Sequence, residues 1–370
     1  MEQRPSRPRI ADVAREAGVS KTAVSFAFNS PERLAPETAT RIREVADSLG
    51  YRPHPVARML TQRQTMTLGV LTPQALAVIF SNPFFAVFSE GVAQVAEAHG
   101  YGLQFISPMH GSLALAIGRA TVDGVVAIGL SADHPEVEQV RRAGLPMVLV
   151  DSDDLPEHGS VVVDDEAGAR AAAEHLIRLG HRRVLVVAVE RPASGPDDNT
   201  AGVSELRLRG YRSAFTAASL DRTAVSVVAG RTSIEGGAAA FQRAWASGIR
   251  PTAVLAMSDA MAIGAMRAAR ELGLRVPDAL SVVGFDDLDL AAHVDPPLTT
   301  VHQPIRQKGS EAVRLLLAEL DATGAHRPEH RRLATRLIVR GSTGPAPAGT
   351  EPTATNPIAT EPPAAEARGT

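Results

Sequence analysis

Hydrophobic residues follow two different periodicities along this chain of 370 residues. Between residues 10 and 49 they recur every three or four positions, which predicts three short amphipathic helices. Gly18 and Gly50 stand where the first and third helices should end, and Pro36 stands where the third should begin. The predicted inward faces are Ile10, Val13, Ala14 and Ala17 in the first helix, and Ile42, Val45, Ala46 and Leu49 in the third.

From Thr67 onward, short runs that are apolar throughout alternate with alanine-rich helical patterns. Such runs indicate parallel β-strands that are covered by helices on both faces. Nearly 280 residues of this pattern favour two α/β lobes over a single sheet. The predicted strands are 68–72, 103–107, 124–129, 146–151, 183–189, 253–257 and 280–286.

The chain ends in a segment of different composition, residues 343–370, which is rich in Pro, Ala, Thr and Gly. It offers too little apolar surface to offset the entropy cost of ordering, so we predict that it is disordered. It also lacks a leucine heptad that could support a coiled coil.

Charge is unevenly distributed between the two ends of the chain. Residues 1–63 hold 11 Lys/Arg and 7 Asp/Glu, whereas the whole chain has a net charge of -3. A basic head on an acidic body suggests that the head meets a polyanion, although so small an excess also arises by chance.

Composition excludes several classes of chemistry. The chain has no cysteine, hence no disulfide, thiolate metal site or cysteine nucleophile. It shows no phosphate-cradling glycine loop, no nucleophile elbow and no metal-ligand spacing, so we expect no catalytic residues, no metal and no cofactor. Because these motifs are missing, we expect that the protein is not an enzyme. No apolar run follows the basic start or approaches a membrane span, so we expect it to be soluble and cytoplasmic.

The second predicted helix follows the first after a tight turn at Gly18, which is typical of a DNA-binding helix-turn-helix. Helical spacing places Val19, Val24, Ala27 and Phe28 on the inward face. The opposite face would enter the major groove, where an apolar ring at Phe26 can contact a thymine methyl group. The candidate DNA contacts of this helix are Ser20, Lys21, Thr22, Ser25, Phe26 and Asn29.

The motifs "IADVAREAGVSKTAVSFAFN" and "PETATRIREVADSLGYRPHPVARML" resemble the lactose-repressor/galactose-repressor (LacI/GalR) family of bacterial transcription factors. The resemblance implies an all-α helix-turn-helix head and a two-lobed α/β effector domain similar to periplasmic binding proteins. It covers all but the tail. It also implies a homodimer that binds a palindromic operator in double-stranded DNA. The expected divisions are a head at 1–52, a hinge at 53–65, an effector and dimerisation domain at 66–342, and the tail at 343–370.

The family hinge forms a helix on DNA, and Leu60 matches its leucine that wedges into the minor groove. Ala57 precedes Leu60 by one turn and is the second hinge candidate. From the residues alone, an equally good interpretation is a stiff linker at Pro53 and Pro55, with Leu60 buried against the body.

The head departs from the family pattern at three positions. Members often carry Arg or His where this chain has Phe26, which removes bidentate guanine recognition there. Members often cap the first and third helices with Ser or Thr, whereas Arg9 and Ala35 stand at those positions here. An uncapped helix start costs about 1 kcal/mol, so the head should be marginally stable without DNA.

The resemblance assigns effector-binding candidates around an interlobe cleft. An arginine fork and carboxylates at strand ends can bind neighbouring sugar hydroxyls, with an aromatic ring below them. Alternatives stay open: Asp259 fits a helix cap, Asp286 and Asp287 could both form a turn, and Arg207 could be a solvated helix residue. His302 could replace Gln303 near the crossover. The candidates are Phe84 or Phe85, Asp151, Arg207, Ser258, Asp286 and Gln303.

Two stretches near the expected cleft differ from the family. An extra apolar stretch, "QALAVIF", precedes the "NPFF" motif, and residues 108–121 leave little room for a full helix. Arg231 fits an acidic or phosphorylated ligand, but a surface arginine is the simpler interpretation. The effector, expected to be a carbohydrate, therefore cannot be identified by transfer.

The sequence thus predicts a homodimeric, effector-controlled repressor that acts at the nucleoid. A solute-binding protein without a DNA role is the rival from another class. An activator, or a regulator with a corepressor, is the nearer rival, because the sign of the coupling depends on a small difference in energy.

Overall fold

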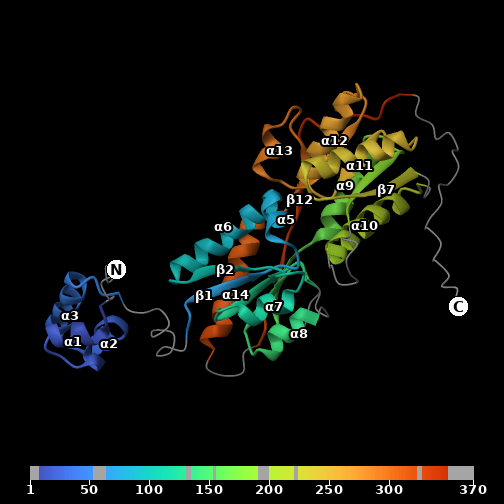
Figure 1. Ribbon diagram of the computed structural model, residues 1–370. Helices are drawn as coiled ribbons and strands as arrows, with labels where there is room; N and C mark the ends of the chain where they lie inside the picture. Colours follow the sequence, from blue (N-terminus) through green and yellow to red (C-terminus); the bar gives the residue numbers. More distant parts are fainter. Residues whose placement is uncertain are drawn as a thin grey trace, which may run out of the picture. The chain divides into compact units, whose positions relative to one another are not determined.

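The computed structural model contains two compact units that divide after Met66. The first unit is helical, and the second contains two β-sheets with helices on their faces (Figure 1). The hinge candidates Ala57 and Leu60 lie outside the described residues. The structure describes residues 8–52, 64–130, 135–152, 156–190, 200–220, 224–322 and 327–348.

The head consists of α1 (Ile10–Glu16), α2 (Lys21–Asn29), a 3-10 turn (Pro31–Arg33) and α3 (Pro36–Ser48), as the sequence predicts. Its core is formed by Val13, Val24 and Ile42, which are fully buried, together with small alanines. Gly18 has a φ of 65°, which lets the Val19 amide donate to the Ala14 carbonyl at 2.9 Å and sets the turn between α1 and α2.

Two details of the head differ from expectation. Leu49, predicted to face inward, is 36% exposed, because it is the C-cap residue that follows the last turn of α3. At the start of α1, the missing cap at Arg9 is compensated, since the Arg9 amide donates to the Asp12 carboxylate at 2.8 Å.

The start of α3 has no such compensation. Ala35 is its N-cap, and no side chain accepts a hydrogen bond from the first amides. We expect Ala35→Ser to stabilise the head by about 1 kcal/mol, since a serine oxygen can accept from the Thr38 amide. Slower hydrogen exchange of the α3 amides, and a higher melting temperature of the head, would record this gain. An unchanged or lower value would contradict the placement of this helix start.

The first lobe is a six-stranded parallel sheet in the order β11-β5-β4-β3-β1-β2. Helices α6 and α14 pack on one face, and α7 and α8 pack on the other (Figure 1). The short helix α5 precedes α6. The bounds are β1 Thr67–Leu71, α5 Leu76–Ser81, α6 Pro83–Ala98, β2 Gly102–Ile106, α7 Leu113–Arg119, β3 Gly124–Ile128, α8 Pro135–Arg142, β4 Met147–Val150, β5 Gly159–Val163, α14 Ile305–Asp321 and β11 His330–Leu333.

The second lobe repeats this plan in the order β12-β10-β9-β8-β6-β7, with β12 antiparallel to its neighbour. Helices α9 and α10 cover one face, and α11 and α12 cover the other. The bounds are α9 Asp165–Arg178, β6 Val184–Val189, α10 Thr200–Ala217, β7 Val225–Gly230, α11 Ile234–Ala246, β8 Ala253–Ala256, α12 Asp259–Glu271, β9 Ser281–Asp286, α13 Asp289–His293, β10 Thr299–His302 and β12 Arg336–Ile338.

Three crossovers join the lobes, after β5, after β10 and after β11. Within each lobe the first five strands follow the doubly wound order 2-1-3-4-5. Ligands of such sheets bind beyond the carboxyl ends of the strands, at the point where the strand order reverses. The fold therefore indicates that the residues that follow β4, β8, β9 and β10 form the candidate binding site.

All seven predicted strands are confirmed, and five others, β5, β7, β10, β11 and β12, were missed. The missed strand β7 has mixed burial at a sheet edge, β11 is short and largely exposed, and β12 has only three residues. The two stretches that differ from the family form the short helices α5 and α7.

The predicted start of the disordered tail, residue 343, is wrong. The Thr343 hydroxyl hydrogen-bonds His175 at 2.9 Å, and the Ala346 amide donates to the Leu179 carbonyl at 2.8 Å. His181 hydrogen-bonds the Gly344 carbonyl at 3.1 Å. These hydrogen bonds show that the packed chain extends at least to residue 346. Amino-acid composition does not reveal such contacts, which explains the wrong boundary.

Candidate functional site

Helix α2 presents a polar face that begins at an exposed N-terminus. The Ser20 hydroxyl accepts a hydrogen bond from the Ala23 amide at 3.1 Å and caps the helix. Lys21 and Thr22 in the first turn are exposed. Behind them, Val24 and Ala27 are fully buried, and Phe28 packs against this core and the ring of Tyr51. The two faces therefore divide as the helical spacing predicts.

Phe26 lies on the outer face but is half-buried, because Arg33 covers it. The Arg33 guanidinium carbon lies 5.2 Å from the centre of the Phe26 ring, within the range of a cation–π contact. Across the residues that the structure describes, the Arg33 side chain makes no hydrogen bond or ion pair, although its backbone amide donates to the Ser30 carbonyl at 3.0 Å. The structure thus adds a guanidinium that the sequence analysis did not consider.

Ser25 and Asn29 occupy the next turn of the same face. The Asn29 side-chain amide donates to the Ser25 hydroxyl at 3.3 Å, so these two candidates bind each other. The Asn29 side-chain oxygen is buried without a hydrogen-bond partner. A buried acceptor of this kind is costly unless a donor reaches it.

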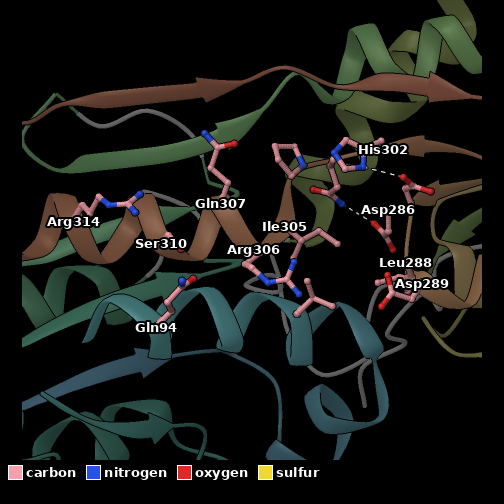
Figure 2. A pocket seen from close by; sticks show the side chains of 14 residues that line it. Gln94, Asp286, Leu288, Asp289, His302, Ile305, Arg306, Gln307, Ser310 and Arg314 are labelled. Atoms are coloured by element: carbon pink, nitrogen blue, oxygen red, sulfur yellow. Dashed lines mark hydrogen bonds and ion pairs between the residues drawn. The ribbon is translucent and has the colours of Figure 1, made fainter. Parts of the chain in front are cut away.

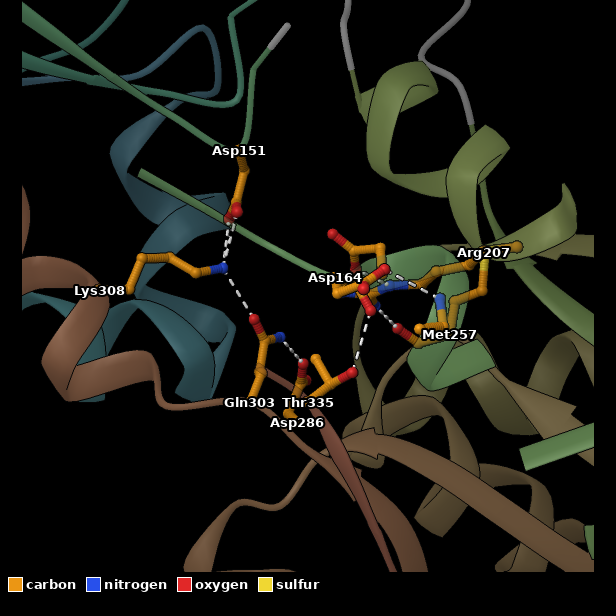
Figure 3. Close-up of polar contacts among 10 residues, drawn as sticks. Asp151, Asp164, Arg207, Met257, Asp286, Gln303, Lys308 and Thr335 are labelled. Atoms are coloured by element: carbon orange, nitrogen blue, oxygen red, sulfur yellow. Dashed lines mark hydrogen bonds and ion pairs between the residues drawn. The ribbon is translucent and has the colours of Figure 1, made fainter. Parts of the chain in front are cut away.

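In the second unit, side chains from both lobes meet near the crossovers (Figure 3). Asp151 follows β4 of the first lobe, Asp286 ends β9 of the second, and Gln303 follows β10. The structure also brings in Lys308 from the first turn of α14. We call these four residues the interlobe relay.

The relay is a continuous chain of short hydrogen bonds. The Lys308 ammonium donates to both oxygens of Asp151, at 2.7 and 2.9 Å, and to the side-chain oxygen of Gln303 at 2.7 Å. The Gln303 amide then donates to Asp286 at 2.6 Å. Lys308 is 1% exposed, so its charge is buried with its partners.

Arg207 lies beside the relay in a second buried ion pair. Its Nε donates to Asp165 at 2.8 Å, and a terminal nitrogen donates to the Met257 carbonyl at 2.5 Å. The guanidinium carbon stands 3.6 Å from the centre of the Phe285 ring. A guanidinium so placed is fixed in direction, which suits it to hold a ligand hydroxyl.

Three carboxylates at this site have left-handed backbone. The φ angles are 54° at Asp151, 126° at Asp286 and 58° at Asp287. Each costs free energy for a residue other than glycine, and such residues gather at binding sites. The strained backbone marks the same strand ends that the sequence predicts.

Burial changes the acidity of the carboxylates. Burial raises the pKa of Asp286 to about 6, although nearby Arg207, Gln303 and Lys308 oppose the shift. Burial likewise raises the pKa of Asp165, against the attraction of Arg207. Asp286 therefore changes its charge near pH 6, above the range of an ordinary aspartate.

Several predicted residues have structural partners instead. The Ser258 hydroxyl caps α12 by accepting from the Met261 amide at 3.2 Å. The interpretation of Asp259 as that cap is wrong, because its carboxylate accepts from the Leu288 amide at 2.8 Å and the Thr300 hydroxyl at 2.5 Å.

The two candidate aromatic rings, Phe84 and Phe85, lie in different surroundings. Phe84 is half-buried, and the Lys308 nitrogen lies 5.3 Å from the centre of its ring. Phe85 belongs to the core of the first lobe. Phe84 is therefore the ring that lies at the relay.

A cavity of about 550 Å³ adjoins the relay at Asp286 and Gln303 (Figure 2). On its wall, His302 hydrogen-bonds Asp287 at 2.9 Å, and Arg340 donates to the other oxygen of Asp287 at 2.6 Å. Asp287 is thus part of an ion-pair cluster. The lining residues are Val87, Gln94, Asp286, Asp287, Leu288, Asp289, His302, Gln303, Pro304, Ile305, Arg306, Gln307, Ser310 and Arg314.

Sequence reasoning missed Lys308, Asp165 and Arg33. One signal was available, since Lys21 and Lys308 are the only lysines in a chain with 38 Lys and Arg. One lies on the exposed face of α2, and the other lies in the relay. No local pattern indicates Asp165 or Arg33, because their partners are distant in sequence or lie on another element.

The fold and these two sites define a DNA-binding transcriptional regulator with a periplasmic-binding-protein-like sensor domain. Residues 9–54 match the model of bacterial regulatory proteins of the lacI family, and residues 173–343 match that of the periplasmic binding protein-like domain. The chain is 33% identical to the HTH-type transcriptional regulator CelR of Thermobifida fusca over 92% of its own length and 99% of that relative. The chain belongs to the lacI family of bacterial transcriptional regulators.

Solved structures agree with this assignment. A complex of the transcriptional regulator CelR with cellobiose covers 91% of this chain and 100% of its own, at 31% identity and a TM-score of 0.66. The lac repressor dimer bound to operator and the anti-inducer ONPF covers 92% and 100%, at 27% identity and a TM-score of 0.76. Within the described ranges, no helix is long and apolar enough to cross a membrane.

Proposed function

We propose that the protein is a homodimeric repressor whose affinity for a palindromic operator is set by a small polyhydroxylated effector at the interlobe relay. The observation that carries this proposal is the meeting of Asp151, Arg207, Asp286 and Gln303 from both lobes and their crossovers. A ligand that binds such a site differently in two lobe arrangements shifts their populations.

The head would supply the DNA contacts. Lys21 and Thr22 stand free at the start of α2, which is the end of a recognition helix that contacts base edges. Arg33 and Phe26 lie together on the adjoining surface. We infer that Lys21, Thr22 and Arg33 are the principal contacts, and that Ser25 and Asn29 orient each other. Because the partner is duplex DNA, we place the protein at the cytoplasmic nucleoid.

The effector site favours a neutral carbohydrate. Arg207 and Lys308 are each paired with a carboxylate, so the cations are already neutralised. Carboxylates, an amide and two cations can accept from and donate to adjacent hydroxyls, and Phe84 can lie against a ring face. The relative CelR is solved with cellobiose, which makes this disaccharide a rational first probe.

An activator, or a repressor that needs a corepressor, uses the same sites with another sign of coupling. A solute-binding protein without a DNA role would not account for the helix-turn-helix head or for the exposed polar face of α2. Selection of bound DNA from a random pool, followed by binding measurements with and without sugars, distinguishes these functions. Binding that selects no palindrome, or that ignores salt, would contradict the repressor proposal.

The pair of Arg33 and Phe26 allows a sharper test. We expect Arg33→Met to weaken operator binding and to reduce the salt slope of log K by about 1, because one cationic contact is lost. Phe26→Ala should alter base preference at one symmetric pair of operator positions, since the ring would no longer hold Arg33 or touch a base. Fluorescence anisotropy at several salt concentrations, together with pool selection, measures both effects.

Arg15→Met is the matched control, because Arg15 lies on α1 and already pairs with Asp12. Its operator profile should equal that of the wild type. An unchanged profile for Phe26→Ala would show that the ring has no part in recognition.

A further inference from the structure

Lys308 is a buried cation whose three donors are all used within the protein. It lies on α14 of the first lobe and donates to Asp151 of the same lobe and to Gln303 on the crossover after β10. A buried ammonium is stable only when its hydrogen bonds are complete. Lys308 therefore fixes the positions of both partners.

The identity of this residue is informative. The chain holds 38 Lys and Arg, yet Lys308 is one of two lysines. An ammonium is compact and directs three donors away from one point, whereas a guanidinium is a planar fork. The acceptors at Lys308 belong to two residues 152 positions apart in sequence, and this arrangement suits the ammonium.

Through Gln303 the contact reaches the other lobe. The amide group of Gln303 accepts from Lys308 with its oxygen and donates to Asp286 with its nitrogen. The side chain is 2% exposed, so water does not compete for these bonds. The relay thus links the end of β4 in the first lobe to the end of β9 in the second.

We propose that Lys308 is a positioning residue that fixes the angle between the lobes through Gln303 and makes the site selective for an uncharged effector. This proposal rests on the proposed function, since it concerns the same effector site. An effector hydroxyl that donates to Asp286 competes with the Gln303 amide for that carboxylate and so loosens the crossover after β10, while the ion pair of Lys308 and Asp151 remains. The relay thereby joins ligand binding to lobe movement.

The charge selection follows from the pairing. An anionic ligand group could bind Lys308 only by displacing Asp151, which would leave that carboxylate without its cation. It would also approach Asp286, which has no lysine or arginine in a recorded ion pair among the described residues. A hydroxyl group meets neither penalty, because it can donate to a carboxylate while the ion pair remains.

Spin-label distances test the positioning role without a ligand. The chain has no cysteine, so Ala98→Cys at the end of α6 and Ala246→Cys at the end of α11 place one label on each lobe at exposed positions. The labelled chain is diluted with excess unlabelled chain, which suppresses distances between protomers. We expect one narrow distance distribution for the wild type and a broader one for Lys308→Met.

Matched variants separate positioning from folding. Gln303→Met breaks the relay while Lys308 keeps Asp151, so it should fold and should broaden the distribution in the same way. Arg314→Met removes an exposed charge from the same helix and should leave the distribution unchanged. Lys308→Arg should give an intermediate width. Distributions of Lys308→Met and Gln303→Met that coincide with the wild type would overturn the positioning role.

Calorimetry with a matched pair of probes tests the charge selection. Cellobiose and cellobiouronate share both rings and differ only where a terminal CH2OH group is a carboxylate, and we expect the wild type to prefer cellobiose. Lys308→Met should bind cellobiose about tenfold more weakly or worse, because Asp151 loses its cation. Tighter binding of cellobiouronate by the wild type would overturn the selectivity. If neither probe binds, the proposed effector class is wrong, whereas the spin-label result still decides the role of Lys308.

Discussion

At pH 7.5 the Asp286→Asn variant is expected to be more stable than the wild-type protein and to lose its response to effector. Asp286 is 4% exposed, and burial raises its pKa to about 6. A shift of two pKa units corresponds to about 3 kcal/mol. Asparagine removes this cost, still accepts from Gln303, and tolerates the left-handed backbone.

The raised pKa determines in which direction the stability of the wild type changes with pH. Because the folded-state pKa is raised, the unfolded protein ionises first, and the wild type loses stability as the pH rises from about 4 to about 6. Above that window both states are ionised, so the difference between wild type and variant stays constant. Chemical denaturation at a series of pH values measures it.

Asp165 and Asp259 also have raised pKa values, so both proteins will show some pH dependence. The difference between them isolates Asp286. Asp278→Asn, which changes an exposed carboxylate, is the control and should follow the wild-type curve. A difference that does not grow between pH 4 and 6 would refute the assigned acidity of Asp286.

The Arg207→Met variant is expected to lose about 3–5 kcal/mol of stability, because it leaves Asp165 as a buried carboxylate without its cation. Arg207 is 7% exposed and also donates to the Met257 carbonyl. Effector binding should disappear as well, since the guanidinium is the fixed donor of the site. Denaturant unfolding and ligand calorimetry measure the two losses.

Arg209 offers a control two residues further along α10. Its side chain is 53% exposed and pairs with the exposed Glu166, so Arg209→Met should cost less than about 1 kcal/mol. The double variant Arg207→Met/Asp165→Leu should recover most of the stability but none of the effector binding. If Arg207→Met and Arg209→Met lose equal free energy of unfolding, the buried ion pair is no more important for stability than the exposed one.

Much of the candidate site could be predicted from strand ends. Asp151 and Asp286 directly follow apolar runs, and in a parallel sheet such ends meet at one edge. The structure brings both into one relay. The resemblance to the family motif implies Ser258 as a further site residue, but its hydroxyl caps α12, because the chain there turns directly from strand into helix.

Lys308 could not be predicted in this way. It lies in the first turn of a helix, three residues after Ile305, where spacing indicates only that it shares a face with buried residues. Whether such a position holds an apolar side chain or a charged one depends on what faces it. Here Asp151 faces it, and Asp151 lies 157 residues earlier in the chain.

The sequence by itself determined the local features of this protein: the helix-turn-helix, seven of the strands and the two faces of α2. Helical and strand periodicity depend on residues that are close in sequence, so they can be recognised without knowledge of the fold. Only the tertiary structure decided which charges neutralise one another, that Arg33 covers Phe26, and that the chain stays packed beyond Ser342. Those contacts join segments that the crossovers and turns bring together. Charges interact more strongly there than in water, because burial lowers the effective dielectric constant.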